Sequence, residues 1–134
     1  MDKVIVYTYG AFDLLHPGHL NLLRNARELG DCLVVGVLDD IAIRERKGKN
    51  RPIQNQVDRI EIVNSLKFVD MVIPQKSYNP YYSMCELPRV DILTKGDDWG
   101  FCEKVAKEYG CKFTAINYSD AYSTTGLIKK IKCS

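Results

Sequence analysis

"KVIVYTYGAFDLLHPGHLNLLRNARELGDCLVVGVL", residues 3–38, contains two short apolar runs on either side of a helical pattern. The runs at 3–9 and 32–38 are rich in β-branched residues, which predicts two buried strands. Between them, apolar residues recur at helical spacing over 19–29, and Gly30 is a favourable residue to end a helix. Two strands joined by a helix in this way are expected to lie parallel in one sheet.

The same alternation of strands and helices continues to the end of the chain. Further helices are predicted over 55–66, 100–110 and 123–131, and further strands over 69–74, 90–96 and 111–116. At 134 residues the chain is predicted to form a single domain, residues 1–134, with a substantial core. We therefore expect an α/β three-layer sandwich with a mainly parallel sheet and helices on both faces.

The composition argues against several classes of function. A net charge of +2 is too small to indicate general binding of nucleic acid or of an anionic membrane. The five cysteines are odd in number, widely spaced and without a CxxC pair, so they predict neither a disulfide framework nor a zinc site. The sequence also lacks a signal peptide pattern and an apolar run of membrane-spanning length. We expect a cytoplasmic protein that binds neither nucleic acid nor membrane.

Both histidines of the chain lie directly after the first predicted strand. Ligands of parallel α/β sheets collect at the carboxyl ends of the strands, so this position favours a binding site. His16 and His19 flank a Pro-Gly pair at the start of a helix, where free backbone N–H groups suit a phosphate. The alternative is a loop histidine followed by an ordinary surface histidine of a helix.

A basic segment, residues 44–51, follows the second predicted strand. We expect it to form a loop that folds over a polyphosphate, with Lys47 and Lys49 as point charges. The alternative is a solvated charge run.

Two polar stretches follow later strands. In "TKGDDWG", residues 94–100, Asp97 or Asp98 could bind a hydroxyl or Mg²⁺, or the stretch could simply form a turn and a helix cap. "STT", residues 123–125, offers hydroxyls at the start of the last helix, either as a cap or as a second anion site. The chain lacks the GxxxxGK[ST] loop of P-loop enzymes, so the pattern indicates another kind of nucleotide phosphate site.

"GAFDLLHPGHLNLLRNARELGD", residues 10–31, resembles the HxGH signature of the cytidylyltransferase-like nucleotidyltransferases. "STTGLIKKI", residues 123–131, is similar to the second signature of that family. The resemblance implies a Rossmann-like domain, usually homodimeric, that joins a nucleoside triphosphate to a phosphorylated substrate. Pyrophosphate leaves without a covalent enzyme intermediate, and Mg²⁺ accompanies the triphosphate.

The resemblance also implies roles for individual residues. The catalytic residues would be His16, His19 and Lys49. The residues that bind the nucleotide would include the same three, together with Gly10, Ala11, Phe12, Lys47, Gly96, Asp97, Ser123, Thr124 and Thr125. The residues near the acceptor substrate would be Asp13, Arg59, Asp98 and Trp99.

Different stretches of the chain resemble different branches of the family. "GDDW", residues 96–99, resembles the glycerol-3-phosphate cytidylyltransferases, although Tyr118 stands where that branch carries a phosphate-binding arginine. "RKGKNRPI" and "NYSDAYSTTGLIKKI" resemble instead the heptose-phosphate adenylyltransferases. We rank first a cytidylyltransferase that joins CTP to glycerol 3-phosphate or a related polyol or amino-alcohol phosphate for cell-surface polymer biosynthesis. The alternatives are an ATP-dependent adenylyltransferase of the heptose-phosphate type and a catalytically inactive nucleotide-binding module.

Overall fold

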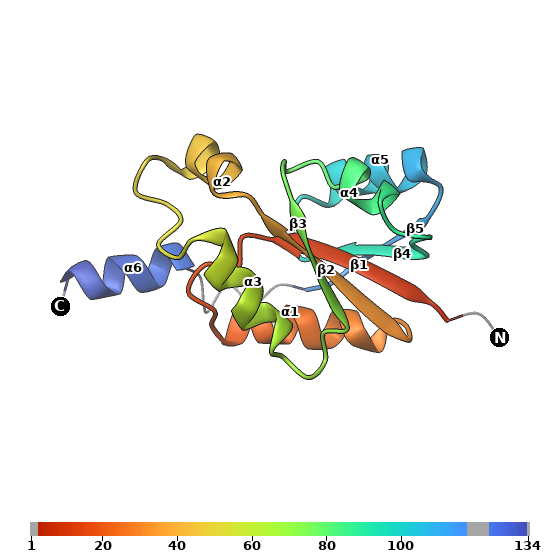
Figure 1. Ribbon diagram of the computed structural model, residues 1–134, viewed down its shortest axis with the longest axis horizontal. Coiled ribbons are helices and arrows are strands. Elements are labelled where there is room, and N and C mark those ends of the chain that lie inside the picture. Colours follow the sequence, from red (N-terminus) through yellow and green to blue (C-terminus); the bar gives the residue numbers. More distant parts are fainter. Residues whose placement is uncertain (1–2, 118–123, 134) are drawn as a thin grey trace.

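A parallel sheet forms the centre of the molecule in the computed structural model, which describes residues 3–117 and 124–133 (Figure 1). Within these residues the sheet has five strands in the order β3-β2-β1-β4-β5. The strands are β1 (Ile5–Gly10), β2 (Cys32–Leu38), β3 (Met71–Gln75), β4 (Ile92–Lys95) and β5 (Lys112–Ala115). Every pairing is parallel, as the sequence predicts.

Helices cover both faces of the sheet and complete the predicted three-layer sandwich. They are α1 (Pro17–Glu28), α2 (Asp40–Lys47), α3 (Gln56–Asn64), α4 (Tyr81–Cys85) and α5 (Trp99–Tyr109), and a further helix, α6 (Thr124–Cys133), lies outside the layers. Helices α1 and α3 contribute to one apolar cluster, which includes Leu23 and Val63. Helices α2, α4 and α5 contribute to a second cluster on the opposite face, which includes Ile43, Met84 and Val105.

The central strands are largely apolar because both of their faces are covered, and Thr8 is a buried polar residue of β1. Residues 6–9 of β1 and 33–38 of β2 are all buried, which is usual for parallel strands packed between helices. The first helix begins two residues before the predicted position, at Pro17. Proline suits the first position of a helix because its fixed φ is helical and it has no N–H to leave unpaired.

The basic segment is the clearest departure from the predicted organisation. Residues 44–47 belong to α2 and not to a loop. This helix forms because the Asp39 side chain caps it at the N–H of Ile41, and because Ile43 buries its apolar side in the core. Basic side chains in its last turn face the negative end of the helix dipole, and Gly48 ends the helix at φ 101°.

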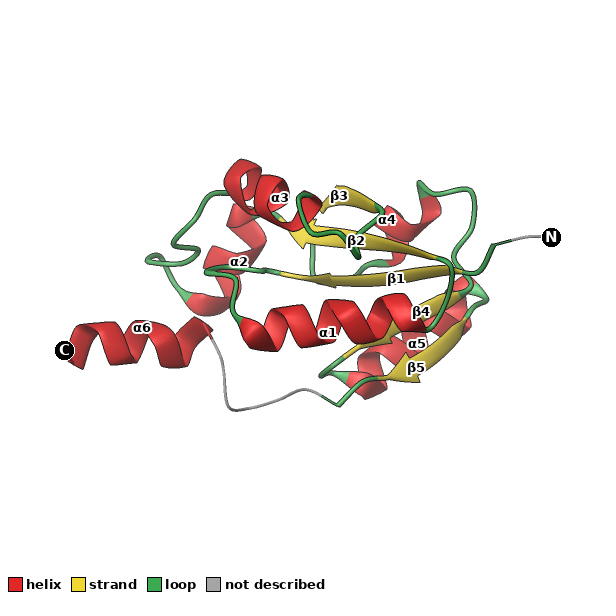
Figure 2. Ribbon diagram, turned by 90° about the horizontal axis from the view of Figure 1, so that it is seen from below, coloured by secondary structure: helices red, strands yellow, loops and turns green. Residues whose placement is uncertain are grey.

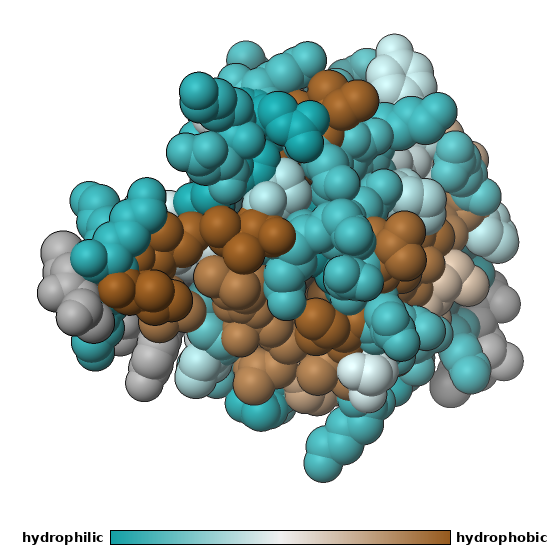
Figure 3. All heavy atoms as spheres, turned by 60° about the vertical axis from the view of Figure 1, so that its left-hand side comes forward, coloured by the Kyte–Doolittle hydropathy of each residue, from teal (hydrophilic) through white to brown (hydrophobic). Residues whose placement is uncertain are grey.

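Two helices differ from what the sequence pattern suggested or from the layered arrangement. The short α4 lies within residues 77–88, where the sequence pattern predicted no regular element. Helix α6 extends away from the three layers (Figures 1 and 2). Apolar side chains gather on the face that α6 and its neighbouring segments present (Figure 3), where Ile53 and Ile128 line a groove. Among the described helices, none is long and apolar enough to cross a membrane.

Candidate functional site

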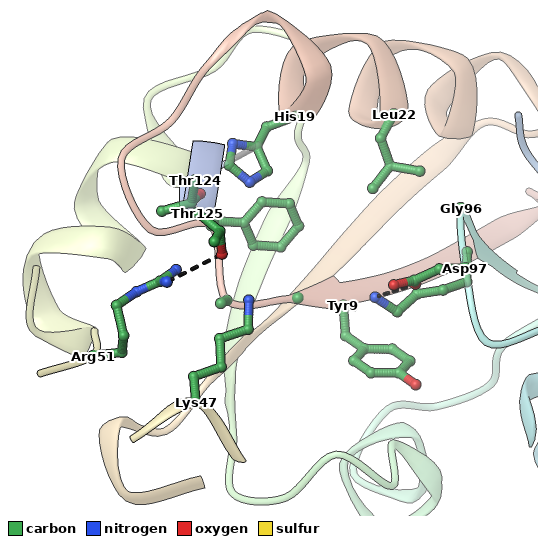
Figure 4. A pocket seen from close by; sticks show the side chains of 13 residues that line it. Tyr9, His19, Leu22, Lys47, Arg51, Gly96, Asp97, Thr124 and Thr125 are labelled. Atoms are coloured by element: carbon green, nitrogen blue, oxygen red, sulfur yellow. Dashed lines mark hydrogen bonds and ion pairs between the residues drawn. The ribbon is translucent and has the colours of Figure 1, made fainter. Parts of the chain in front are cut away.

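A cavity of about 160 Å³ lies where the carboxyl ends of β1 and β4 meet (Figure 4). The chain runs from β1 to β2 on one side of β1 and later adds β4 on the other side. This change of direction makes the gap between β1 and β4 the expected ligand site of the sheet. The lining residues are Tyr9, Gly10, Ala11, Phe12, His19, Leu22, Lys47, Arg51, Lys95, Gly96, Asp97, Thr124 and Thr125.

The loop after β1 is held in an unusual conformation. Phe12 and Leu14 both have φ of 53°, in the left-handed region that side-chain-bearing residues rarely adopt. Between them, the fully buried Asp13 carboxylate accepts hydrogen bonds from the backbone N–H groups of Ile53 and Gln54, at 2.8 and 2.9 Å. These bonds tie the loop to the segment before α3 and stabilise its strained backbone.

The two histidines form a reciprocal cap at the start of α1. His16 Nδ1 accepts from the N–H of Gly18 at 3.1 Å, and His19 Nδ1 accepts from the N–H of His16 at 3.1 Å. The two rings stack with centroids 3.8 Å apart, and Phe12 packs 5.5 Å from His19. Because each Nδ1 is an acceptor, a neutral ring must carry its proton on Nε2.

Both imidazoles are neutral at physiological pH. Burial lowers the pKa of His19 to about 3, and the neighbouring His16 and Lys47 add to this effect. Burial likewise lowers the pKa of His16. The imidazole of His19 faces the cavity (Figure 4), so it can serve there as a neutral N–H donor and not as a cation.

Positive charge in the cavity comes from other elements. Among the described residues, Lys47, Arg51 and Lys95 line the cavity as cations, from the end of α2, the following segment and the end of β4. Desolvation lowers the pKa of Lys47, and repulsion from Arg51 lowers it further. Lys95 pairs with Asp97 at 3.2 Å and lies 4.5 Å from the centroid of the Tyr9 ring. The cations outnumber Asp97, so the cavity favours an anionic ligand.

Helix α6 brings its first residues to the same cavity. Thr124 is buried, and its hydroxyl donates a hydrogen bond to the carbonyl of Asp13. Thr125 Oγ1 accepts from Arg51 Nη1 at 3.3 Å. Two residues that lie 111 positions apart in the sequence, Asp13 and Thr124, thereby fix the N-terminal end of α6 beside the end of β1. The free N–H groups of a helix start suit a phosphate oxygen.

A second cavity, of about 380 Å³, adjoins the first. The two share Gly10, Ala11, Lys47, Lys95 and Asp97. The second is also lined by Leu38, Arg46, Tyr78 and Asp98. The guanidinium carbon of Arg46 lies 4.1 Å from the centroid of the Tyr78 ring, and Arg46 Nη2 lies 3.7 Å from a carboxylate oxygen of Asp98. The two cavities thus adjoin each other along the ends of β1 and β4.

Most residues predicted to bind the nucleotide are brought together here. Those that line the first cavity are Gly10, Ala11, Phe12, His19, Lys47, Gly96, Asp97, Thr124 and Thr125. His16 stacks on His19 and caps the same helix. Asp98 lines the adjoining cavity. Ser123 lies outside the described residues.

Four of the predicted site residues lie elsewhere. The fully buried Arg59 lines neither cavity, and its guanidinium donates to the carbonyls of Gln54 and Ala11 and pairs with Asp40. Asp13 is likewise engaged by backbone N–H groups. Lys49 is exposed in the turn after α2 and does not line the cavity. Trp99 donates from Nε1 to the carbonyl of Lys95 and lines neither cavity.

The sequence analysis missed four lining residues of the first cavity, and Leu38, Arg46 and Tyr78 of the second. Tyr9 and Leu22 are apolar-pattern residues, and no sequence signal separates them from core positions. Lys95 is the last residue of β4 and lies near the carboxyl end of the strand predicted over 90–96, so its position was a usable signal. Arg51 belongs to the basic segment, but which cations of that segment reach the cavity depends on the path of the chain after α2.

Comparisons with known proteins agree with this geometry. The sequence pattern of the cytidylyltransferase-like family matches residues 7–132. The bifunctional protein HldE of Campylobacter fetus is 39% identical over 130 residues, which are 97% of this chain and 28% of that protein. HldE of Campylobacter concisus is 40% identical over 130 residues. This chain therefore spans about 27–28% of the length of these relatives.

A solved structure extends the similarity to three dimensions. The lipopolysaccharide core biosynthesis protein from Thermoplasma volcanium superposes with a TM-score of 0.76 and 28% identity, over 89% of this chain and all of that one. The family match includes the HPGH turn at the start of α1 and the threonines at the start of α6, the two segments that meet at the cavity. The chain therefore belongs to the cytidylyltransferase-like family of nucleotidyltransferases.

Proposed function

We propose that this chain transfers the adenylyl group of ATP to a phosphorylated sugar of the heptose type and releases pyrophosphate. The matches to HldE support this alternative better than the cytidylyltransferase that the sequence analysis ranked first. The resemblance of residues 46–53 and 117–131 to heptose-phosphate adenylyltransferases points the same way. The similarity to a lipopolysaccharide core biosynthesis protein supports a product destined for the cell surface.

The observation that carries the proposal is the positively charged cavity between the ends of β1 and β4. It combines two helix starts, a neutral histidine donor and cations from three parts of the chain. Phosphoryl oxygens are the ligands that such a set of donors recognises best. The cavity lacks an activated nucleophile among its described lining residues, which suits direct transfer between two bound substrates.

The proposed reaction is an in-line displacement at the α-phosphorus of ATP. An oxygen of the sugar phosphate forms a new bond to this phosphorus, the bond to the bridging oxygen of the β-phosphate breaks, and pyrophosphate leaves. His19 would donate its Nε2–H to an oxygen on the α-phosphate, where negative charge grows. Lys47 and Lys95 would stabilise charge on the phosphates as they separate.

The adjoining cavity is the proposed place of the sugar phosphate. Arg46 and Lys47 supply positive charge there, and the Tyr78 ring, over which the Arg46 guanidinium lies, forms part of the wall. The five residues shared by the two cavities would keep the acceptor oxygen close to the α-phosphate. Close placement of two bound reactants is the main source of rate enhancement in this kind of transfer.

The cavity residues fit a Mg²⁺ ion that arrives bound to the triphosphate. Among the described residues, no group of three or more His, Cys, Asp or Glu side chains could hold a metal ion. Mg²⁺ in nucleotide sites commonly takes one or two carboxylates, with water and phosphate oxygens as the other ligands. Asp97, whose carboxylate is exposed at the cavity edge, would be its protein ligand. The ion would neutralise charge on the triphosphate.

Cytidylyl transfer to glycerol 3-phosphate is the second candidate. It is favoured by the stretch Gly96-Asp97-Asp98-Trp99, of which the first three residues line the two cavities. A homodimer and a cytoplasmic location stay predictions; sedimentation velocity of the purified protein and fractionation of the cells that make it would test them.

Release of pyrophosphate tests the proposal directly. Purified protein is offered ATP or CTP, each with heptose phosphates, glycerol 3-phosphate and other phosphorylated alcohols. We expect turnover with ATP and a heptose phosphate at a kcat/KM at least about 10-fold above every CTP pair. Preference for CTP would overturn the adenylyl proposal, and no turnover with any pair would favour the inactive nucleotide-binding module.

A matched pair of variants tests the proposed role of the histidine. His19→Ala should lower kcat by about 100-fold, because one donor to the developing charge is lost. Asn25→Ala, at an exposed position of the same helix, should leave kcat unchanged. Near-normal turnover of His19→Ala would contradict the mechanism.

A further inference from the structure

Arg51 lines the cavity, although the resemblance to the family assigned no role to it. Its side chain is only 11% exposed and lies between the loop after β1 and the start of α6. Nε lies 3.4 Å from a carboxylate oxygen of Asp13, and Nη1 lies 3.3 Å from the hydroxyl of Thr125. Charge-assisted hydrogen bonds are normally 2.7–2.9 Å long, so both contacts are weak. The Asp13 carboxylate is engaged more closely by two backbone N–H groups.

The third nitrogen of this guanidinium is the informative one. Nη2 is buried and has no hydrogen-bond partner among residues 3–117 and 124–133. A desolvated, charged donor without a partner is costly, and such groups in native sites usually meet a ligand. Arg51 lines the cavity between β1 and β4, so an anion bound there can be that ligand.

The surroundings of Arg51 indicate which part of a nucleotide it meets. In Figure 4 its guanidinium points into the cavity beside Thr125 and Lys47, whereas His19 faces the cavity from the start of α1. In the proposed reaction the α-phosphate lies at His19. The pyrophosphoryl group would then extend toward Arg51 and Lys47, where two neighbouring cations repel each other until an anion lies between them.

We infer that Arg51 is a substrate-binding residue that holds the pyrophosphoryl part of the nucleoside triphosphate, with Nη2–H as a donor to its oxygens. Arginine suits this role because its planar guanidinium can bind two phosphate oxygens at once and keeps its charge at any physiological pH. The inference rests on the nucleotidyl-transfer function proposed above, but not on whether the nucleotide is ATP or CTP.

The inference also bears on a gap in the family signature. The chain has Tyr118 where the glycerol-3-phosphate cytidylyltransferase branch carries an arginine, and this position lies outside the described residues. Arg51 brings a guanidinium from a different part of the chain to the threonines of the same signature. A phosphate-binding charge would thus come to Thr125, at the start of α6, from residues 46–53, the stretch that resembles the heptose-phosphate branch.

Direct binding measurements on the full chain test the inference. Isothermal titration calorimetry with pyrophosphate, ATP and AMP is carried out on the wild type, Arg51→Gln, Arg51→Lys and Arg44→Gln. Arg44 is a matched control because it is an exposed cation of the same segment that lines neither cavity. We expect Arg51→Gln to weaken the binding of pyrophosphate and of ATP by about 10- to 100-fold, as for the loss of a charged hydrogen bond. The affinity for AMP should change by less than about twofold, because AMP lacks the pyrophosphoryl group.

The other outcomes separate a binding role from a structural one. Arg51→Lys should recover part of the pyrophosphate affinity because it keeps the charge, and Arg44→Gln should bind all three ligands like the wild type. Equal loss of AMP, ATP and pyrophosphate affinity, with a lower urea midpoint, would mean that Arg51 only supports the loop and would overturn the inference. So would unchanged pyrophosphate affinity in Arg51→Gln.

Pyrophosphate carries neither base nor acceptor, so this test does not depend on the proposed choice of substrates. If the wild type adenylates a heptose phosphate but Arg51→Gln binds pyrophosphate normally, the inference fails alone. If the wild type prefers CTP but Arg51→Gln loses pyrophosphate affinity, the adenylyl proposal fails alone.

Discussion

Acidification is expected to destabilise this protein through His19. The native imidazole is buried, and its Nδ1 accepts the N–H of His16, so a proton on Nδ1 would break the cap of α1. Its native pKa is lowered to about 3, whereas the unfolded chain has the ordinary value near 6.5. The unfolded state therefore binds a proton at a pH at which the native state does not. The contribution of His19 to the free energy of unfolding is fully present above pH 6.5 and is lost progressively as the pH falls toward 3.

The size of the effect follows from these two pKa values. At pH 5 the unfolded imidazole is about 97% protonated and the native one is neutral. Each pH unit below 6.5 then costs about 1.4 kcal/mol, so His19 alone removes about 2 kcal/mol between pH 8 and pH 5. The pKa of Asp91 is also lowered, but its contribution is lost only below its ordinary value of 3.8, outside this range.

Urea unfolding at several pH values between 8 and 5 measures this loss in the wild type and in His19→Asn. Asparagine does not titrate, and its side-chain oxygen can take over as acceptor for the N–H of His16. Burial also lowers the pKa of His16, which adds to the acid sensitivity of both proteins, so the difference between them measures what His19 adds. The wild type should lose about 2 kcal/mol more than the variant. Equal losses, within about 0.5 kcal/mol, would refute the reasoning.

Three further substitutions have defined expected effects. Arg59→Met should lower the free energy of unfolding by about 3 kcal/mol, because Asp40 loses its cation and two carbonyls lose their donor. Gly36→Ala should lower it by a similar amount, about 3 kcal/mol, because its Cβ would lie 2.1 Å from the Tyr7 hydroxyl and displace a buried hydrogen bond. Lys95→Met should raise the Kd for ATP by about 10-fold, measured by calorimetry, with an unchanged urea midpoint.

Each of these variants has a matched control. Arg44→Met removes an exposed cation, and Gly100→Ala adds a Cβ that meets no atom within 4 Å. Lys104→Met removes an exposed lysine of α5 that lies outside the cavity. Arg44→Met and Lys104→Met should behave as the wild type, and Gly100→Ala should be at least as stable, because alanine favours a helix more than glycine does. Urea midpoints of Arg59→Met or Gly36→Ala that match their controls would show that these contacts do not stabilise the fold, and normal ATP affinity of Lys95→Met would remove that lysine from the site.

Local patterns were enough to predict the three-layer fold and its parallel sheet. The apolar runs around residues 5–10 and 32–38 leave no polar face, so they require cover on both sides, and the helical pattern between them requires a parallel return. The anion-binding character of the HPGH turn was equally readable, because the free N–H groups at the start of a helix suit an anion, although the helix begins at Pro17 and not at His19.

The boundaries of α2 and the existence of α4 were less predictable. The capping of α2 by Asp39 and the burial of Ile43 outweigh the repulsion among the basic residues that suggested a loop. In α4, the five-residue length is too short for apolar periodicity to identify a helix.

The sequence by itself determined the fold class, the strand ends at which the cavity lies, and the two signature segments that meet there. Only the tertiary structure decided which charges reach the cavity. Arg51 and Lys47 do, Lys49 does not, and Arg59 is fully enclosed by protein partners. The physical reason is distance along the chain. A cation's role depends on contacts with residues tens of positions away, such as those of Arg51 with Asp13 and Thr125, and no local pattern encodes them.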